Sequence, residues 1–548
     1  MSNKSEYLEK FPDGSPQRWQ VEKRDKHWNI AMPNGAVIDV DIDAPKLHYD
    51  ADFPQDRESS RLWANSLRYI VPMLGKGDYE TSWTLLSQLN DILAQDLKDE
   101  HGRFSGSLDH QFALQLRTLC ELRAWLLKRP QSGDTAAMDS VLTETVASIY
   151  RHVQSIGLLR PNNHGIMLGI SLLHSFYMFE DVPWKLSGQS SESGRDEVEQ
   201  FLLESLFSVL GTDGVANENT PIYQGFYLKL LSGITDFQTW AYGTAHADFA
   251  AMNSKATTAY RHMLLPNGAV PPLGDASVSM QRQLKALPGL WTTVENGLLV
   301  RSNSDSFFSF VCGYRGVFHK QLDDSSIFLW HKGDALIQDA GLKSYDGNDP
   351  VAVGIRGQLG HSGLFFPRFD SLRAEKVVAY GSGTRLISAS MEVRNADSVD
   401  SFQAVGRYAF RNVAVERCVT WTGERSFMLR DFVRADSASG RAVSRFLLDP
   451  QAEVRFLDSG VVVVRTNRAW MTIAGNDSRV NVNLSKGVSG DEGTSRGFLA
   501  PKNYSSEPTY MLEFEVPLST ETDSDEVVGK HLLRIVYGGV DEPLTVHQ

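Results

Sequence analysis

Apolar residues in the first half of the chain recur every three or four positions, which is the spacing of amphipathic helices. Gly157 and Gly211 follow two of these stripes and supply the residue type that commonly ends a helix. Pro72 lies inside another stripe, so we expect that helix to kink or end there. Residues 166–179 are apolar on nearly every side, which predicts an inner, buried helix. The stripes span residues 63–74, 112–126, 142–156 and 198–209.

From about Asn296 the pattern changes to short apolar or alternating runs separated by turns such as Lys332-Gly333-Asp334. Many short strands joined by frequent turns are typical of an antiparallel β-sandwich. The change of pattern falls between Pro271 and Gly297. The runs span residues 307–314, 327–331, 335–338, 386–393, 427–433, 461–465 and 469–474.

A series of helices followed by a series of strands predicts an α+β multidomain chain. At about 150 residues per domain, the 548 residues allow two to four domains. We expect an extended, polar lead-in over residues 1–54, a helical domain over 55–290 and an antiparallel β-sandwich over 291–548. The helices are irregularly spaced, so spacing alone does not decide between an (α/α) toroid and a solenoid.

The composition is that of a folded protein, with 42% hydrophobic residues and a net charge of −13. The acidic balance argues against a nucleic-acid surface, which needs clustered Lys and Arg, but it leaves a local basic pocket open. The three cysteines are too widely spaced for a thiolate zinc site or a disulfide framework. No apolar run is long enough for a membrane span or a signal peptide, so we expect a cytoplasmic location by default, with periplasmic or secreted locations left open.

Two polar stretches in the helical half could carry chemistry. Arg160–Gly165 stands immediately before the predicted buried helix, where polar groups would meet the rim of a cavity. Asn163 could instead cap that helix, and His164 could be a hydrogen-bonded structural residue. The second stretch runs to Gln224, where Thr220 can cap a helix that starts with proline. Tyr223 in that helix could equally be a core residue.

Two further polar stretches lie nearer the strands. Leu264–Gly268, followed by Pro271–Asp275, is a turn-rich loop. His319–Ser326 interrupts otherwise apolar strands, and Gln338–Gly341, Tyr345 and Gly360–Ser362 follow it. Such a cluster is either a solvated loop or a site for an anion or a metal.

Taken in order, these stretches resemble the heparinase II/III-type polysaccharide lyases and their bacterial relatives associated with surface polysaccharides. The matching motifs run through roughly residues 55–450, the helical half first and the β half second. The resemblance implies an incomplete (α/α) toroid followed by an antiparallel β-sandwich, with the substrate cleft between them. It also implies β-elimination at a uronic acid in an anionic polysaccharide or oligosaccharide. The motifs are NNHG, DG…ENTPIYQ, LPNG…PPLGD, HKQLDD, DAGLKSYD and GHS.

The resemblance implies four catalytic residues. Removing the proton α to a uronate carboxylate builds up negative charge that hydrogen-bond donors must stabilise, and Asn163 takes that role. Tyr223 is the proton-transfer residue, and His164 and His319 either polarise the carboxylate or act as the base. Because an unperturbed tyrosine has a pKa of about 10, Tyr223 needs nearby positive charge to act as a base but not to act as an acid.

Further residues are candidates for binding the substrate. Arg160, Lys320 and Arg356 could attract an anionic glycan, although each could also be a solvated surface charge. Glu218 could orient neighbouring groups or simply favour the helix dipole, and Tyr345 completes the set.

One position departs from the family pattern. Many relatives carry a second histidine two residues after the one matching His319, and with a later aspartate and histidine it holds a metal. Here that position is Gln321, a poor zinc ligand, while Asp339 and His361 still match. We expect no required cofactor, and a hydrogen-bonded Gln321–Asp339–His361 cluster in preference to a structural zinc or calcium. Gln224 also replaces a common histidine after the tyrosine, which weakens any proton relay there.

The function expected is therefore that of a polysaccharide lyase that leaves an unsaturated uronate end. A glycoside hydrolase on a similar helical scaffold would instead need two carboxylates roughly 5–10 Å apart at the cleft. A non-catalytic glycan-binding protein of polysaccharide biosynthesis is the other alternative. The polysaccharide, the mode of cleavage and the oligomeric state do not follow from the sequence.

Overall fold

The structure is a computed structural model in which the chain divides into two compact units. Unit 1 consists of Met1–Ser208 and Leu230–Asn253, and unit 2 of Val209–Lys229 and Ser254–Gln548. The predicted domain limits at residues 54 and 290 stay a prediction. The structure describes residues 4–11, 19–32, 35–48, 57–96, 108–129, 133–180, 191–277, 279–280, 284–374, 378–379, 384–385, 387–410, 412–436, 440–457, 460–476, 480–491, 494–520 and 526–545.

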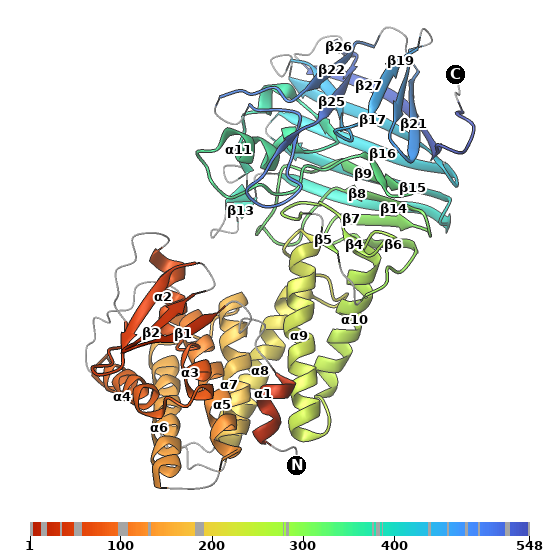
Figure 1. Ribbon diagram of the computed structural model, residues 1–548. Helices are drawn as coiled ribbons and strands as arrows, with labels where there is room; N and C mark the ends of the chain where they lie inside the picture. The colour runs from red at the N-terminus through yellow and green to blue at the C-terminus, as the bar shows by residue number, and fades with distance from the viewer. Residues whose placement is uncertain are drawn as a thin grey trace. The chain divides into compact units, whose positions relative to one another are not determined.

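Unit 1 is mainly helical, and helices α4 to α8 lie side by side (Figure 1). Helix α5 packs on both α6 and α7, and its many buried residues make it an inner helix. The predicted buried helix at 166–179 is observed as α7. The helices that contribute to unit 1 are α1 (Tyr7–Lys10), α2 (Arg57–Asn65), α3 (Ile70–Gly75), α4 (Tyr79–Asp96), α5 (Leu108–Leu127), α6 (Gly133–Ile156), α7 (Asn163–Met178), α8 (Ser191–Leu210), α9 (Pro221–Tyr242) and α10 (Ala247–Met263).

The first predicted helix is broken, but not at Pro72. Helix α2 ends at Asn65, and α3 begins at Ile70 and contains Pro72 in its first turn. Proline is tolerated in a first turn because the backbone N–H that it lacks has no partner within the helix there. The chain turns at Leu67, whose φ of 58° is left-handed, so the prediction of a kink at Pro72 was wrong.

The predicted lead-in contains regular structure. A short 3-10 turn, η1 (Lys4–Glu6), precedes α1. Three strands, β1 (Gln20–Arg24), β2 (His27–Ala31) and β3 (Val37–Asp41), pair as an antiparallel sheet. Alternating buried residues such as Trp28, Ile30 and Val40 explain why these strands form.

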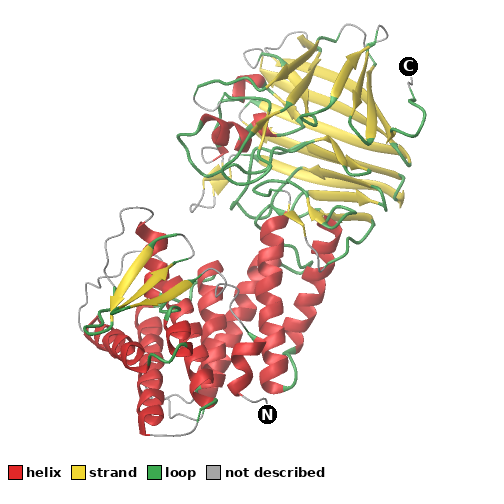
Figure 2. Cartoon of the chain, in the orientation of Figure 1, coloured by secondary structure: helices red, strands yellow, loops and turns green. Residues whose placement is uncertain are grey.

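Unit 2 is built from antiparallel sheets (Figure 2). A five-stranded sheet has the order β10-β9-β8-β7-β6, and a second sheet has the order β14-β15-β16-β17-β27-β21-β20-β19, with β26 paired to β27. Their strands are β6 (Gly289–Thr293), β7 (Leu298–Ser302), β8 (Ser306–Val311), β9 (Ser326–His331), β10 (Asp334–Ile337), β14 (Ser388–Ser398), β15 (Ser401–Phe410), β16 (Val413–Gly423), β17 (Ser426–Asp436), β19 (Glu453–Phe456), β20 (Val461–Arg465), β21 (Ala469–Gly475), β26 (Leu518–Thr520) and β27 (Glu526–Gly539).

A four-stranded sheet of order β11-β18-β25-β22 and short pairs complete unit 2. The pairs are β4 with β5, β12 with β13, and β23 with β24. The remaining elements are β4 (Ala269–Val270), β5 (Ser279–Met280), α11 (Pro350–Arg356), η3 (Gln358–Gly360), β11 (Leu364–Phe365), η4 (Pro367–Phe369), β12 (Val378–Ala379), β13 (Thr384–Arg385), β18 (Ala442–Leu447), β22 (Val482–Lys486), β23 (Phe498–Leu499), β24 (Glu507–Pro508) and β25 (Tyr510–Val516).

The main core of unit 2 joins side chains of its two large sheets. Side chains on opposite faces of β8 enter different clusters. Phe308 and Phe310 lie on one face and belong to the main core, and Phe307 lies on the other face and belongs to a smaller cluster. Trp421 of β16 lies in the main core, and its ring stacks on that of Phe427 with centroids 4.8 Å apart. This core fixes the strands, and the loops at their ends carry the polar stretches at 319–326 and 338–341.

Candidate functional site

The Arg160–Gly165 stretch forms the loop that enters α7 in unit 1. Asn162 is the N-cap, and its side chain accepts a hydrogen bond from the Gly165 backbone N–H at 2.9 Å. Asn163 is therefore not the cap, which corrects that alternative. Its Oδ1 accepts from the His164 N–H at 3.0 Å, and its side chain is half-buried.

Gly165 is required by the packing of that loop. A Cβ on Gly165 would lie 2.0 Å from the backbone oxygen of Arg160, so one of the two segments would have to move. We expect Gly165→Ala to destabilise unit 1 by about 1–3 kcal/mol, measured by denaturant unfolding. The matched control is Gly233→Ala in α9, where nothing lies within 4 Å, and we expect no loss of stability there. Equal stability of the two variants would contradict this account of the loop.

His164 is paired with a carboxylate. Its Nδ1 lies 3.4 Å from Oδ1 of Asp109, and the hydrogen bond between them raises the pKa of His164 above its usual value. Burial would raise the pKa of Asp109, but hydrogen bonds from His164 and from the His110 N–H outweigh it, so that pKa is lowered. The positive charge of Arg160, which is exposed, acts in the same direction. This cluster offers an oriented imidazole, an amide and a guanidinium.

A second cluster lies in unit 2 around His319. The Nε2 atom of His319 is 3.2 Å from Oε2 of Glu218, and its Nδ1 atom is 2.9 Å from Oδ2 of Asp275. Tyr227 donates from its hydroxyl to Oε1 of Glu218 at 2.7 Å. A carboxylate therefore faces each ring nitrogen of His319 and fixes the orientation of the imidazole. His319 has a left-handed φ of 55°, which its contacts must hold in place.

Two tyrosines complete this cluster. The ring of Tyr223 stacks on the ring of His319 with centroids 3.9 Å apart. Tyr345 donates its hydroxyl proton to Oδ2 of Asp275 at 2.7 Å, and its oxygen lies 3.0 Å from Nδ1 of His319. A hydrogen bond also links the hydroxyls of Tyr223 and Tyr345.

The surroundings keep Tyr223 protonated. Burial raises the pKa of Tyr223, and the charge of Glu218 raises it further, while the bond to Tyr345 lowers it. Burial and the charge of Asp275 raise the pKa of Tyr345 even more. A tyrosine that stays protonated is suited to donate a proton to a leaving oxygen.

The β half of the chain matches a known family. Residues 287–508 match the family model described as heparinase II/III-like, C-terminal. The chain carries a heparinase II/III-like C-terminal domain. A sequence comparison with curated proteins finds no match. The resemblance predicted from the ordered motifs is thereby confirmed.

Solved structures share the fold of this chain. A mutant of heparan sulfate lyase HepC from Pedobacter heparinus is 13% identical, with 97% of this chain and 86% of that chain covered and a TM-score of 0.70. A heparinase III is 14% identical over 90% of this chain and 81% of that chain, with a TM-score of 0.68. The predicted order of a helical region followed by antiparallel sheets is confirmed. Among the described residues, no helix is long and apolar enough to cross a membrane.

Two of the predicted substrate-binding residues lie close together. Tyr345 is 53% exposed, and the guanidinium of Arg356 lies over its ring, 5.6 Å from the centroid. Glu218 is mostly buried and contacts His319 and Tyr227.

Lys320 is not placed for substrate binding. Its side chain is 1% exposed, and its ammonium pairs with Asp323 and lies 3.3 Å from Oδ1 of Asp324. Burial would lower the pKa of Lys320, but the two carboxylates outweigh that cost and raise it. The ammonium is therefore a buried structural charge, which corrects the expectation from its position beside His319.

The residues matching the family's metal position are held by hydrogen bonds. Asp339 uses Oδ2 to bind Nδ1 of His361 at 2.8 Å and Oδ1 to accept from the Gly341 N–H at 3.2 Å. Gln321 donates to Asp275 at 2.6 Å, so the expected three-residue cluster forms only between Asp339 and His361. No group of three or more His, Cys, Asp or Glu side chains able to hold a metal occurs among the described residues.

Asp275 is a site residue that the sequence analysis did not single out. It is buried and accepts hydrogen bonds from His319, Tyr345 and Gln321. The sequence placed Asp275 at the end of the Pro271–Asp275 motif, but that motif by itself indicates only a loop. Gly274 precedes it with a φ of 59°, and a Cβ there would lie 2.7 Å from the Asn219 oxygen.

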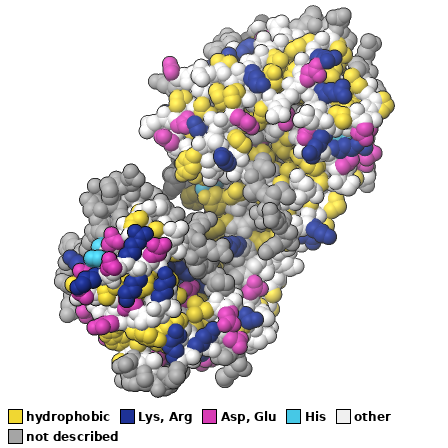
Figure 3. Space-filling view, viewed as in Figure 1, with side chains coloured by type: hydrophobic (Ala, Val, Ile, Leu, Met, Phe, Trp, Pro, Cys, Tyr) yellow, Lys and Arg dark blue, Asp and Glu magenta, His cyan; other side chains and the backbone are white. Residues whose placement is uncertain are grey.

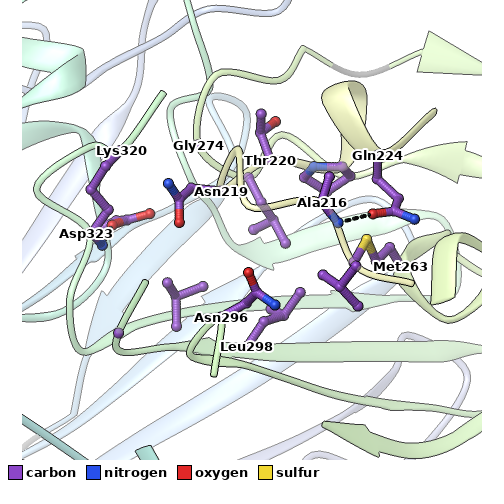
Figure 4. Close-up of a pocket in the computed structure, with 15 residues that line it drawn as sticks. Ala216, Asn219, Thr220, Gln224, Met263, Gly274, Asn296, Leu298, Lys320 and Asp323 are labelled. Atoms are coloured by element: carbon purple, nitrogen blue, oxygen red, sulfur yellow. Dashed lines mark hydrogen bonds and ion pairs between the residues drawn. The ribbon is translucent and has the colours of Figure 1, made fainter. Parts of the chain in front are cut away.

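A small cavity of about 40 Å³ lies beside these segments in unit 2 (Figure 4). Asn219 donates from Nδ2 to the carbonyls of Gly316 and Phe318, so its Oδ1 faces the cavity. Thr220 also lines it, and its hydroxyl has no hydrogen-bond partner among the described residues, so the predicted side-chain cap of α9 is not made. Gln224, which replaces the common histidine, donates to the Gly214 carbonyl and holds the loop that precedes Glu218.

Proposed function

We propose that the chain is a polysaccharide lyase that cleaves a uronic-acid-containing anionic glycan by β-elimination. The observation that carries this proposal is the stacking of Tyr223 on His319, with both ring nitrogens of the histidine facing carboxylates. It is supported by the heparinase II/III-like domain and by the shared fold with a heparan sulfate lyase.

Tyr223 is the proposed acid in this reaction. Its protonated hydroxyl would give its proton to the glycosidic oxygen as the bond to C4 breaks. The hydroxyl of Tyr345, which contacts Asp275, would support Tyr223 through the hydrogen bond between the tyrosines. The imidazole of His319 would donate a hydrogen bond to the uronate and so stabilise the negative charge that develops there.

His164 is the proposed base, because the carboxylate of Asp109 orients its imidazole. Asp109 holds Nδ1, which leaves Nε2 as the atom that accepts the C5 proton. Asn163 would bind the uronate carboxylate through its amide, and Arg160 would add a positive charge. On the face drawn in Figure 3, Lys and Arg are interspersed with Asp and Glu, so local groups of this kind carry the recognition of an anionic chain.

The function is tested by digesting a panel of uronate-containing polysaccharides and following ultraviolet absorbance. We expect absorbance to rise with the unsaturated uronate ends of at least one polysaccharide. Binding of acidic glycans by calorimetry without any product would instead support the non-catalytic alternative.

The pH dependence tests the assignment of the base. Because Asp109 raises the pKa of His164, the neutral form is lost as pH falls through a value above 6.5, and kcat/KM should fall with it. Asp109→Asn removes that effect, so we expect the acid limb of the pH–rate profile to move to lower pH. Movement of the limb in Glu218→Gln, but not in Asp109→Asn, would assign the base to His319 instead.

A further inference from the structure

Gln321 is a buried amide whose orientation is fixed by its neighbours. Its side chain is 1% exposed, and Nε2 lies 2.6 Å from Oδ1 of Asp275 and 3.4 Å from the carbonyl oxygen of Gly341. Both neighbours are acceptors, so the amide nitrogen, not the oxygen, must face them. Oε1 is left buried without a hydrogen-bond partner among the described residues.

The other oxygen of Asp275 holds the reactive side chains. Oδ2 accepts from Nδ1 of His319 at 2.9 Å and from the Tyr345 hydroxyl at 2.7 Å. One oxygen of Asp275 therefore binds Gln321, and the other binds His319 and Tyr345. A carboxylate pinned at one oxygen presents the second in a fixed direction, which is how outer hydrogen bonds orient groups at an active site.

The same amide argues against a metal at this centre. A zinc site needs imidazole, thiolate or carboxylate ligands, and Gln321 instead turns its nitrogen toward Asp275. Asp339 already uses both oxygens, for His361 and for the Gly341 N–H. Of these residues, the side-chain atoms left without a hydrogen-bond partner are Nε2 of His361 and Oε1 of Gln321, two neutral donors where a structural zinc takes four ligands.

We propose that Gln321 is a positioning residue that pins Asp275 in a metal-free centre and thereby fixes His319 and Tyr345 for proton transfer. The role in catalysis rests on the proposed lyase function. The geometry of the centre and its metal content do not depend on that function, so both can be tested on the protein without substrate.

The first test replaces the amide with an apolar side chain of similar length. In Gln321→Met, we expect kcat to fall about 10–100-fold with little change in KM, because substrate contacts are kept while the carboxylate is no longer pinned. The matched control is Gln115→Met in unit 1, which removes another buried amide that donates to the Asn65 carbonyl. We expect the control to lose stability but keep its kcat. An unchanged kcat in Gln321→Met would overturn the proposal.

The second test separates positioning from packing. Gln321→Glu puts a carboxyl group against Asp275, and two carboxyls at this distance must share a proton. We therefore expect the activity of the variant, relative to that of the wild type at the same pH, to rise as pH is lowered. A loss of activity that is the same at every pH would mean that residue 321 acts through packing alone and would overturn the proposed hydrogen bond.

Two readouts do not depend on turnover. We expect purified protein to contain zinc well below one atom per chain and to keep its melting temperature in EDTA; stoichiometric metal whose removal lowers the melting temperature would overturn the metal-free centre. On ¹⁵N-histidine-labelled protein, we expect the His319 imidazole signals, assigned from His319→Gln, to shift in Gln321→Met. Unchanged signals would overturn the positioning role. If the wild type cleaves no glycan but these results hold, only the proposed function fails.

Discussion

Replacing Tyr223 with phenylalanine is expected to lower kcat by about 10²–10⁴-fold, the usual contribution of a general acid. The substitution keeps the ring that stacks on His319 and removes only the hydroxyl that is bonded to Tyr345. KM should change little, because the proton is transferred in the transition state. The measurement is the initial rate of ultraviolet absorbance with the best polysaccharide substrate.

Tyr510→Phe is the matched control for this prediction. Tyr510 lies in β25 of the same unit and contacts Lys486 through its ring, 4.1 Å from the ammonium to the centroid. Its hydroxyl has no part in the cluster around His319, so we expect wild-type activity. Retention of most of the activity in Tyr223→Phe would remove the tyrosine from the chemistry and move the acid role to another residue.

Replacing Lys320 with methionine is expected to destabilise unit 2 by about 3–5 kcal/mol. Asp323 and Asp324 are both buried, and the substitution would leave two carboxylates without their shared cation. Protonation can relieve part of this cost, since burial already raises the pKa of Asp324. We expect the midpoint of denaturant unfolding to fall and the loss to be smaller at low pH.

An exposed lysine provides the contrast. Lys26 pairs with Asp43 at 2.5 Å, with side chains that are 73% and 62% exposed, so Lys26→Met should leave the unfolding midpoint unchanged. If Lys320→Met were as stable as the wild type and only raised KM, the sequence-based expectation that Lys320 binds the substrate would be restored.

The secondary structure could be predicted where burial imposes a period on the sequence. The buried helix α7 and strands such as β20 and β21 follow from their apolar residues alone. The break at Leu67 could not be predicted, because a left-handed leucine is imposed by packing rather than by local preference. Pro72 misled the prediction because the start of α3 was not known, and that start decides whether a proline is tolerated.

The candidate site was predictable only in part, for a physical reason. Tyr223 and His319 lie in polar motifs that stand out from their surroundings, whereas Asp275 reads as a loop residue until the fold brings it against His319. Lys320 follows His319 directly, yet the side chain of Lys320 is 1% exposed and that of His319 is 21% exposed. Sequence position gives the charge of a residue but not its burial, and burial decides between a ligand-binding lysine and a structural one.

The two carboxylates at His319 raise the question of hydrolysis, since glycoside hydrolases use a carboxyl pair. Here Asp275 is held by three donors and Glu218 by Tyr227 and His319, and the two side chains are only 2% and 12% exposed. Carboxyl groups that are already bonded and shielded are poorly placed to attack a sugar or activate water. The cluster therefore favours elimination, in which a tyrosine and a histidine transfer the protons.

The most direct test of this account is the mass of the oligosaccharides released from a uronate-containing polysaccharide. Elimination breaks the chain without adding water, so each new non-reducing end should be an unsaturated uronate, lighter by one water than a hydrolysis product. We expect these lighter products from the wild type, and from Tyr223→Phe at a rate lower by about 10²–10⁴-fold. Products that have all gained one water per cleavage would contradict it and identify the chain as a hydrolase.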